Sequence, residues 1–244
     1  MKGIFNSIKY HLLCSYFFLC HVFALRKSSV IVMFHHVRDD EATDVIDSCK
    51  CTINEFRAFI DFVTQHKKVV SLQELLSIEN RSFKDKVVIT FDDVPDNFYT
   101  NAYPILKEAN LPFVLYIASN MIGQKGFLSE NQLQILANDS LCTIGGHTRN
   151  HVFLSDPKID LYEEIFQCKN DIEKIIGKEV RHFAYPYGTP VAVNMNVVKY
   201  TKASHCYQSA VSTIPSFVNQ FSLHSLFFLP RMYHKYFMKI NRDN

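Results

Sequence analysis

The sequence contains no tryptophan and only seven glycines in 244 residues. These glycines form neither GxGxxG nor GxxxxGKS/T, the loops that cradle phosphate groups in nucleotide sites, so the sequence gives no indication of a nucleotide cofactor. The formal net charge is only +2 at pH 7, which gives no case for a nucleic-acid partner. Internal repeats, low-complexity segments and linkers are also missing, which leaves one folded domain as the simplest organisation.

The cysteines do not form a recognisable framework. There are seven of them, at positions 14, 20, 49, 51, 142, 168 and 206. An odd number at irregular spacing favours free buried thiols in a reducing compartment over a set of disulfides. Cys49 and Cys51 are too isolated in the sequence to predict a zinc site.

The N-terminal segment has two interpretations. Residues 12–25 form an apolar run that follows Lys2 and Lys9 and is too short for a comfortable membrane span. One interpretation is a secretory signal peptide cleaved near Ala24. The interpretation that we favour is a membrane-associating helix with basic ends, which agrees with free cysteines and places the protein in the cytoplasm or at the inner face of the membrane.

Short apolar runs alternate with amphipathic helical segments along the chain. The expected strands are residues 30–34, 69–70, 87–91, 113–117, 141–144, 180–184, 207–212 and 226–229. Capping boxes predict helix starts at Thr52, Ser71 and Ser129, and a proline and a glycine mark the two ends of the longest helix, residues 156–177. About eight strand candidates alternating with helices predict a parallel, barrel-type α/β fold.

One of these strands ends in two adjacent carboxylates, Asp92 and Asp93. An Asp–Asp pair after a strand is most often a turn or a helix cap. Burying like charges side by side is costly, however, and a metal ion on one carboxylate, with the other kept as a base, would compensate them. Neighbouring strand residues point to opposite sides, so both carboxylates can share one site only if the strand has ended.

Two further stretches carry groups that suit such a site. The apolar residues 141–144 lead into His147 and His151, and two imidazoles four residues apart can reach one ion. Arg181 lies near the start of another expected strand, residues 180–184, which is followed by a turn at Pro186. Each stretch alone has an ordinary explanation, since the chain contains eleven histidines and prolines are common in loops.

Taken together, the three stretches resemble the polysaccharide deacetylase family with the NodB homology domain (carbohydrate esterase family 4). That family carries TFDD, H(S/T)xxH and RxxxxPxG in this order. The similarity extends over roughly residues 30–231, and it implies a distorted (β/α) barrel of about seven or eight strands with its chemistry at the C-terminal strand ends. We therefore divide the chain into an N-terminal segment, residues 1–27, and a deacetylase domain, residues 28–244.

The resemblance also implies a role for each residue of the motifs. Asp93, His147 and His151 correspond to the ligands of one divalent metal ion, for which zinc is expected. Asp92 corresponds to the catalytic base. Arg181 corresponds to the arginine that orients this base and keeps it ionised.

The remaining matches concern the substrate and the loops around the site. The backbone N–H of Tyr187 corresponds to the donor that stabilises the oxyanion, and Pro186 belongs to the same substrate-binding turn. Thr148 is expected to fix the histidine loop, although an ordinary turn hydroxyl is nearly as good an explanation. His35 occupies the histidine position of the family's M-Y-H motif, where it either faces the sugar groove or is a structural histidine.

The implied function is removal of the N-acetyl group from an N-acetylhexosamine in a surface polysaccharide or its precursor. The partner is then an acetylated amino-sugar glycan. Two alternatives stay open: a carbohydrate-binding relative with weak or no turnover, and an O-deacetylase on the same fold, because an ester and an amide share the tetrahedral intermediate.

Two departures from the family pattern bear on these alternatives. Val94 follows the acidic pair where glycine is usual, and because a β-branched residue resists positive φ we expect a differently built turn. Arg231 stands where many members have a histidine that acts as the acid, and arginine cannot hand over a proton. We expect Arg231 at the mouth of the barrel, Asp92 to return its proton to the nitrogen, and His224 and His234 to be surface or packing residues.

Overall fold

The computed structural model describes residues 28–39, 49–77 and 82–242. The N-terminal segment, with its signal-like or membrane-associating run, lies outside the described residues, as do residues 40–48, 78–81 and 243–244. Across the described ranges, no helix has both the length and the apolar character needed to span a bilayer. The five cysteines in these ranges carry free thiols.

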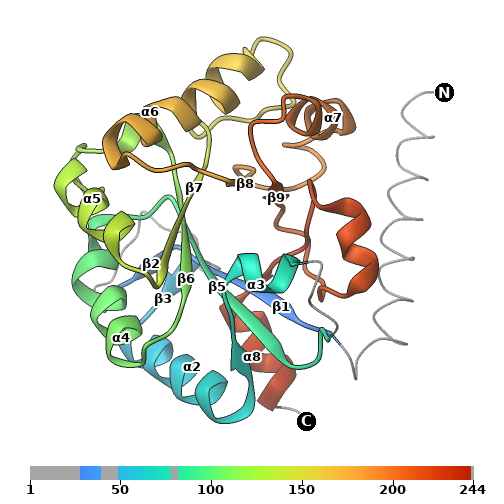
Figure 1. Cartoon of the computed structure of the whole chain (residues 1–244). Helices are drawn as coiled ribbons and strands as arrows, with labels where there is room; N and C mark the ends of the chain where they lie inside the picture. The colour runs from blue at the N-terminus through green and yellow to red at the C-terminus, as the bar shows by residue number, and fades with distance from the viewer. Residues whose placement is uncertain (1–27, 40–48, 78–81, 243–244) are drawn as a thin grey trace.

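Strands and helices alternate along the chain (Figure 1). The strands of the main sheet are β1 (Val30–Phe34), β4 (Lys68–Val69), β5 (Lys86–Asp92), β6 (Phe113–Ile117), β7 (Cys142–Gly146), β8 (His182–Ala184), β9 (Ser209–Val211) and β10 (Met232–Tyr233), and β2 (His36–Val37) pairs with β3 (Lys50–Cys51) in a second sheet. The α-helices are α2 (Ile53–His66), α3 (Leu72–Leu76), α4 (Tyr103–Glu108), α5 (Glu130–Asn138), α6 (Cys168–Ile176), α7 (Met195–Ala203) and α8 (His234–Arg242). The shorter turns are η2 (Phe98–Ala102), η3 (Ser119–Met121), η4 (Tyr162–Gln167) and η5 (Gln220–Ser225).

The main sheet is parallel throughout and runs in the order β10-β1-β5-β6-β7-β8-β9, with β4 beside the start of β5. A short stretch, which we call the closing segment (residues 229–233), connects the two edges of this sheet. The first residue of this segment, Leu229, forms a parallel bridge with Val211, the last residue of β9. The last two residues form β10, which pairs with β1. The sheet thus forms the expected distorted barrel, thinly closed on this side.

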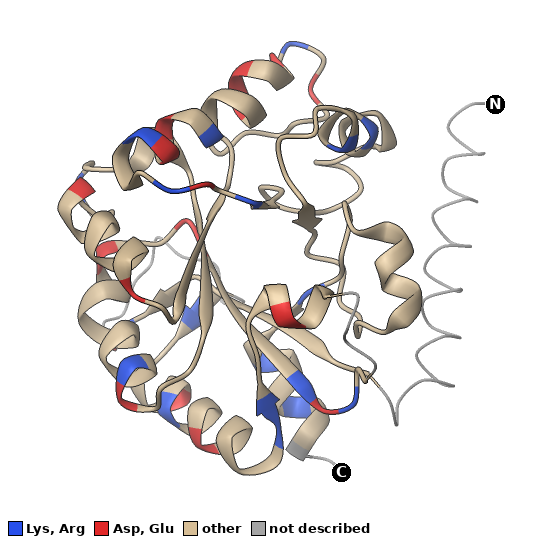
Figure 2. Cartoon of the chain, in the orientation of Figure 1, with Lys and Arg blue, Asp and Glu red and all other residues tan. Residues whose placement is uncertain are grey.

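Lys, Arg, Asp and Glu residues lie mostly in the helices and loops that surround the sheet (Figure 2). The strands are correspondingly apolar, and every residue of β1 and β6 is buried. Within the described ranges, the buried Asp, Glu and Arg side chains are Asp92, Asp139, Glu164 and Arg231. Because a buried charge is unfavourable unless it is paired or hydrogen-bonded, these few positions are where function should be sought.

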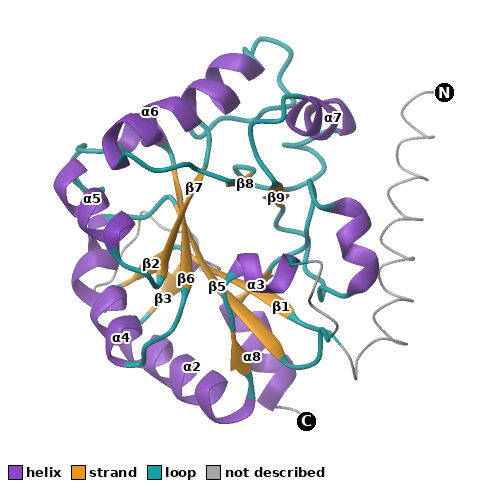
Figure 3. Ribbon diagram, in the orientation of Figure 1, coloured by secondary structure: helices purple, strands orange, loops and turns teal. Residues whose placement is uncertain are grey.

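The strands separate two apolar cores. The outer core lies between the sheet and the helices that surround it, among them α2, α4, α5 and α6 (Figure 3). The inner core fills the barrel and includes Leu72 and Leu75 of α3. In β5, Ile89 and Phe91 face the outer core and Val88 faces the inner one, so strand alternation directs Thr90 and Asp92 into the barrel.

The predicted capping boxes at Thr52 and Ser129 are confirmed as the starts of α2 and α5. Ser71 makes only half of such a box, because its side chain accepts from the Glu74 N–H without the reciprocal bond. Gly177 ends α6 with a φ of 67°, the left-handed conformation that glycine adopts most easily.

Two expected elements differ from the structure. Residues 226–229 form no regular strand; this stretch follows η5, and only Leu229 makes a β-bridge. The helix expected from residue 156 begins later, with the π-helical turn η4 at Tyr162. Asp156 instead accepts a hydrogen bond from the Lys158 N–H over 2.9 Å, a local turn that competes with helix formation.

Candidate active site

The acidic pair lies at the C-terminal end of β5. The strand stops at Asp92, and Asp93 and Val94 both adopt positive φ angles, 60° and 44°. The Val94 N–H donates to the Asp92 carbonyl over 2.6 Å, which makes a three-residue turn of the γ type. Because the strand is broken here, Asp93 is not forced to the face opposite Asp92.

The expectation that Val94 would require a differently built turn is wrong. Val94 adopts the positive φ itself, a conformation that destabilises by on the order of 1–3 kcal/mol. Its side chain is 1% exposed and packs in the outer core, and such burial stabilises by about 1.5–3 kcal/mol. The two effects are of the same size, so hydrophobic burial offsets the backbone strain.

His147 follows the two glycines that end β7. A Cβ on Gly146 would lie 2.5 Å from the Tyr207 hydroxyl oxygen, so only glycine fits this approach. The His147 Nδ1 lies 2.7 Å from the Ala184 carbonyl. A carbonyl can only accept a hydrogen bond, so Nδ1 carries the proton and Nε2 carries the lone pair. Burial lowers the pKa of His147 to about 4, and the ring is therefore uncharged at neutral pH.

The loop between the two histidines is braced by Thr148 and Glu164. The Thr148 hydroxyl accepts from the His151 N–H over 2.9 Å, as expected from the sequence. The buried Glu164 carboxylate accepts from the N–H groups of Arg149 and Asn150, each over 3.0 Å. Glu164 was not predicted, because it comes from η4, more than a dozen residues away, in a stretch without a motif.

The structure brings Asp93, His147 and His151 together, with one ligand atom of each within 4.8 Å of the others. The Asp93 Oδ1 lies 3.5 Å from the His147 Nε2 and 3.2 Å from the His151 Nε2. The Asp93 and His151 side chains are 27% and 24% exposed, so solvent reaches the cluster from one side. Two imidazoles and a carboxylate with an open position are a donor set that suits zinc.

Asp92 is held by Arg231. The two guanidinium nitrogens of Arg231 donate to the two Asp92 oxygens, each over 2.6 Å. Arg231 also donates to the Ser212 carbonyl over 2.9 Å and to the Thr90 hydroxyl over 3.3 Å, and it stacks 5.4 Å over the Tyr116 ring. Both charges are buried, and the pair is bidentate, the geometry in which an arginine binds a carboxylate best.

The charge of Arg231 decides the ionisation of Asp92. Burial alone would raise the pKa of Asp92, but Arg231 and, to a smaller extent, His147 outweigh it and hold the pKa well below its usual range. Asp92 is therefore an ionised, solvent-shielded carboxylate beside a cluster of metal-ligating groups. This is the arrangement of a proton acceptor next to a metal site.

A family model described as polysaccharide deacetylase matches residues 79–206, just over half of the chain. The chain belongs to the polysaccharide deacetylase family. The poly-beta-1,6-N-acetyl-D-glucosamine N-deacetylases of Staphylococcus epidermidis and Staphylococcus aureus are 27% identical over 190 residues and 28% identical over 163 residues. These matches cover 67% and 60% of this chain and 66% and 56% of the relatives, so the chain spans less than two thirds of either relative.

The fold is shared with solved members of the family. The crystal structure of a polysaccharide deacetylase from Bacillus cereus superposes with a TM-score of 0.74 at 23% sequence identity, over 87% of this chain and 68% of that one. The barrel expected from the sequence resemblance is therefore confirmed.

The pairing of Arg181 with Asp92, expected from the family motif, is wrong in this member. Arg181 is 45% exposed and bonds to Glu179 over 2.8 Å. It precedes β8, and the N-terminal ends of parallel strands lie at the edge of the sheet opposite to the end of β5. Arg231 takes this place from the closing segment, and it is buried against Asp92 rather than exposed at the mouth of the barrel.

Tyr187, which follows Pro186 in the same turn, lies beside His151, the partly exposed histidine of the cluster. The ring centroids of Tyr187 and His151 are 4.8 Å apart. The Tyr187 ring also stacks on the Phe153 ring, with centroids 4.1 Å apart. Tyr187 has a φ of 60°, and its carbonyl accepts from the Thr213 hydroxyl over 2.6 Å. Its backbone N–H donates to no acceptor among the described residues, which leaves it available to an oxyanion.

His35 lies within the electrostatic field of the acidic pair. Burial lowers its pKa, and the carboxylates of Asp92 and Asp93 oppose this shift. The His35 Nδ1 atom is buried and has no hydrogen-bond partner in the described part of the chain. His224 and His234 were expected to be surface or packing residues rather than the catalytic acid. His224 is exposed on η5, and His234 packs against a phenylalanine ring of the outer core.

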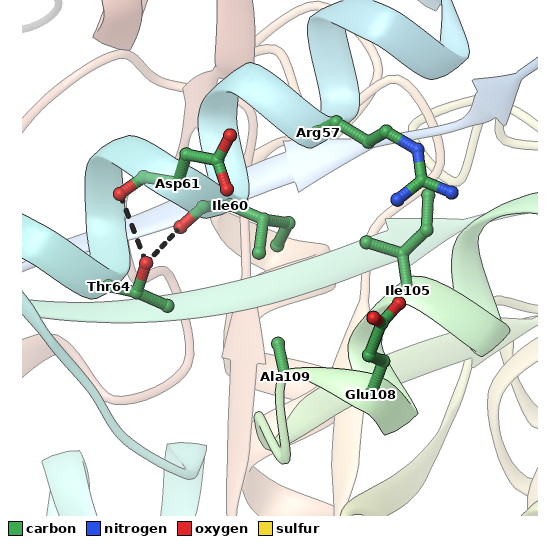
Figure 4. A pocket seen from close by; sticks show the side chains of 7 residues that line it. All are labelled: Arg57, Ile60, Asp61, Thr64, Ile105, Glu108 and Ala109. Atoms are coloured by element: carbon green, nitrogen blue, oxygen red, sulfur yellow. Dashed lines mark hydrogen bonds between the residues drawn. The ribbon is translucent and has the colours of Figure 1, made fainter.

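A second concavity lies away from this chemistry, between α2 and α4 (Figure 4). Its volume is about 370 Å³, and it is lined by Arg57, Ile60, Asp61, Thr64, Ile105, Glu108 and Ala109. The Thr64 hydroxyl is bound to backbone carbonyls of its own helix. The concavity contains none of the family's motif residues, so we do not assign the reaction to it.

Proposed function

We propose that the chain is a metal-dependent deacetylase that hydrolyses the N-acetyl group of N-acetylglucosamine units in a surface polysaccharide or its precursor. The observation that carries this proposal is the ionised Asp92 carboxylate beside the cluster of Asp93, His147 and His151. The names of the two staphylococcal relatives support a β-1,6-linked N-acetylglucosamine polymer as the substrate class.

The cluster fits a divalent ion by the chemistry of its donors. The His147 Nδ1 is engaged by a backbone carbonyl, so its Nε2 lone pair is directed toward Asp93. The Asp93 carboxylate supplies the negative charge that a hard or borderline ion prefers. Zinc held by these three residues would polarise a water molecule and the acetyl oxygen.

Asp92 would then carry out the proton transfers, and Tyr187 would stabilise the intermediate. An Asp92 oxygen accepts a proton from the attacking water, and the bond from the water oxygen to the acetyl carbon forms. The Tyr187 N–H donates to the oxyanion of the tetrahedral intermediate. Asp92 returns the proton to the nitrogen as the carbon–nitrogen bond breaks, because Arg231 keeps its own protons at every accessible pH.

Acetate release tests the proposal. The protein, loaded with zinc, should release acetate from partly acetylated β-1,6-linked glucosamine oligomers and lose this activity on treatment with a chelator. His147→Ala should abolish zinc binding at the cluster of Asp93, His147 and His151, and with it acetate release. His224→Ala, which removes an exposed histidine of η5, is the matched control and should retain both.

The panel should also include O-acetylated glycans, because two other outcomes would replace the proposal. Faster release from O-acetyl than from N-acetyl groups would assign an O-deacetylase. Binding of the oligomers without release of acetate from either type, by a protein that holds zinc, would assign a carbohydrate-binding role.

His35→Ala should reduce kcat/KM about 5- to 150-fold. The buried Nδ1 atom of His35 has no partner among the described residues, and a substrate hydroxyl or amide would supply one. The loss of one such contact corresponds to about 1–3 kcal/mol. A loss of a hundredfold or more, the range of general acid catalysis, together with a changed basic limb of the pH profile, would name His35 instead of Asp92 as the proton donor.

A further inference from the structure

A second cluster of ligating side chains lies where the small sheet, α2 and α8 meet. Cys51 comes from the end of β3, Glu55 from the first turn of α2, and His234 from the start of α8. One sulfur, oxygen or nitrogen atom of each lies within 4.8 Å of those of the other two. Two of the three are separated from the third by most of the chain, so only the fold brings them together.

His234 is the member of this cluster that lacks a partner. Its side chain is only 3% exposed, and neither ring nitrogen makes a hydrogen bond to any described residue. The ring stacks on Phe34 with centroids 4.7 Å apart. Stacking accounts for the position of the ring but satisfies no nitrogen, and buried polar atoms without partners are rare in folded proteins.

Cys51 and Glu55 each keep an atom free for a ligand. Cys51 is 1% exposed, and among the described residues its thiol makes only a weak hydrogen bond, to the Thr52 carbonyl at 3.5 Å. Burial raises the pKa of this thiol, so it is protonated when nothing binds it. One Glu55 oxygen caps α2 by accepting from the Thr52 N–H over 2.8 Å, and the other is not engaged in the cap.

We propose that Cys51, Glu55 and His234 form a second metal site, which binds a zinc-class divalent ion independently of the deacetylase centre. A thiolate, an imidazole and a carboxylate are ligands that zinc takes together. On binding, the sulfur–metal bond replaces the sulfur–hydrogen bond, and the proton leaves to solvent. Glu55 is exposed, which gives an ion a path in and a water molecule as fourth ligand.

Such an ion would join three elements, β3, α2 and α8. His234 follows directly on the closing segment, three residues after Arg231. An ion on His234 would anchor the end of that segment to the first turn of α2. Its role is therefore structural, and it lies on the outer side of β1, with Phe34, rather than on the Asp92 side.

Cobalt distinguishes the two sites by their ligands. Co²⁺ bound to a thiolate gives a charge-transfer absorption in the near ultraviolet, and the Asp93, His147 and His151 cluster contains no sulfur. The full chain, titrated with Co²⁺, should bind two ions and show this band. Cys51→Ser should bind one ion without the band, whereas His147→Ala should bind one ion and retain it.

Two matched variants complete the experiment. Cys206→Ser removes a free thiol outside the cluster and should leave the band unchanged. Glu55→Gln keeps a residue that can cap α2 but removes the anionic ligand, and it should weaken Co²⁺ binding at this site about tenfold or more. It also serves if Cys51→Ser does not fold.

Thermal unfolding supplies a readout that does not depend on spectra. Zinc should raise the Tm of His147→Ala, whose remaining site is the proposed one, and at the same zinc concentration should raise the Tm of the double variant with Glu55→Gln by less. A single ion per chain without the near-ultraviolet band, or a band that persists in Cys51→Ser, would overturn the second site. Neither result would bear on acetate release, which is measured separately.

Discussion

Asp92→Asn is expected to reduce acetate release by a hundredfold or more while leaving zinc binding close to that of the natural protein. The amide keeps the shape of the carboxylate and can still accept a hydrogen bond from Arg231, but it cannot accept the proton of the attacking water. General base catalysis contributes about 10²–10⁴-fold to rate, and the variant should lose that contribution. The measurements are kcat for acetate release and zinc stoichiometry of the same preparation.

Asp93→Asn is the matched control, because it changes the neighbouring carboxylate by the same single group. It should lose zinc affinity, since Asp93 lies 3.5 Å and 3.2 Å from the two imidazole nitrogens of the cluster. Loss of zinc from Asp92→Asn, with retention by Asp93→Asn, would exchange the roles of the two residues. Tm values of both variants exclude unfolding as the cause.

Arg231→Ala should remove most activity and move the acidic limb of the pH profile upward. Arg231 now opposes the effect of burial on Asp92, and without it burial raises the pKa of Asp92 above its usual value of about 3.9. At any pH below that raised pKa, Asp92 is protonated and cannot act as base. The profile of kcat/KM against pH, measured for the variant and the natural chain, gives the shift.

Arg181→Ala provides the comparison, since Arg181 bonds to Glu179 at the surface. It should leave the pH profile unchanged and alter stability by less than about 1 kcal/mol. An upward shift in Arg181→Ala, with none in Arg231→Ala, would restore the pairing expected from the family motif.

The same pair of arginine variants should differ in stability. Removing one partner of a buried ion pair destabilises by about 3–5 kcal/mol, so Arg231→Ala should lower the free energy of unfolding at neutral pH. The folded-state pKa of Asp92 is depressed, so the stabilisation from the pair is present above the unfolded-state pKa of about 3.9. It is lost as the pH falls through the folded-state value, and the difference between variant and natural chain should shrink only in strong acid.

Local sequence signals predicted the local features of this fold. The capping residues Thr52 and Ser129 act within one helical turn, so they can be recognised from neighbouring residues alone. The continuous apolar runs of β1 and β6 likewise indicate buried strands without knowledge of their partners. The cluster of Asp93, His147 and His151 could be predicted because each motif sits at the end of such a strand. Parallel strands bring these ends to one edge of the sheet.

The partner of Asp92 could not be predicted in the same way. Asp92 and Arg231 are 139 positions apart, and no spacing rule connects them. The family motif favoured Arg181, whereas the geometry depends on how the last part of the chain returns to β1. The contact of Glu164 with the histidine loop depends likewise on how η4 packs, and a π-helical turn has no clear sequence signal.

The closing segment couples closure of the barrel to the ionisation of Asp92, because the same residues are needed for both. Its backbone joins β9 to β1 through one bridge at Leu229 and the short β10, and the same segment carries Arg231. Opening of this stretch would expose Leu229 and Met232, which are fully buried, and would break the buried ion pair, so it requires a substantial share of the free energy of global unfolding. Each such opening would withdraw the guanidinium from Asp92, so hydrogen exchange at residues 229–233 should report the lifetime of the competent state.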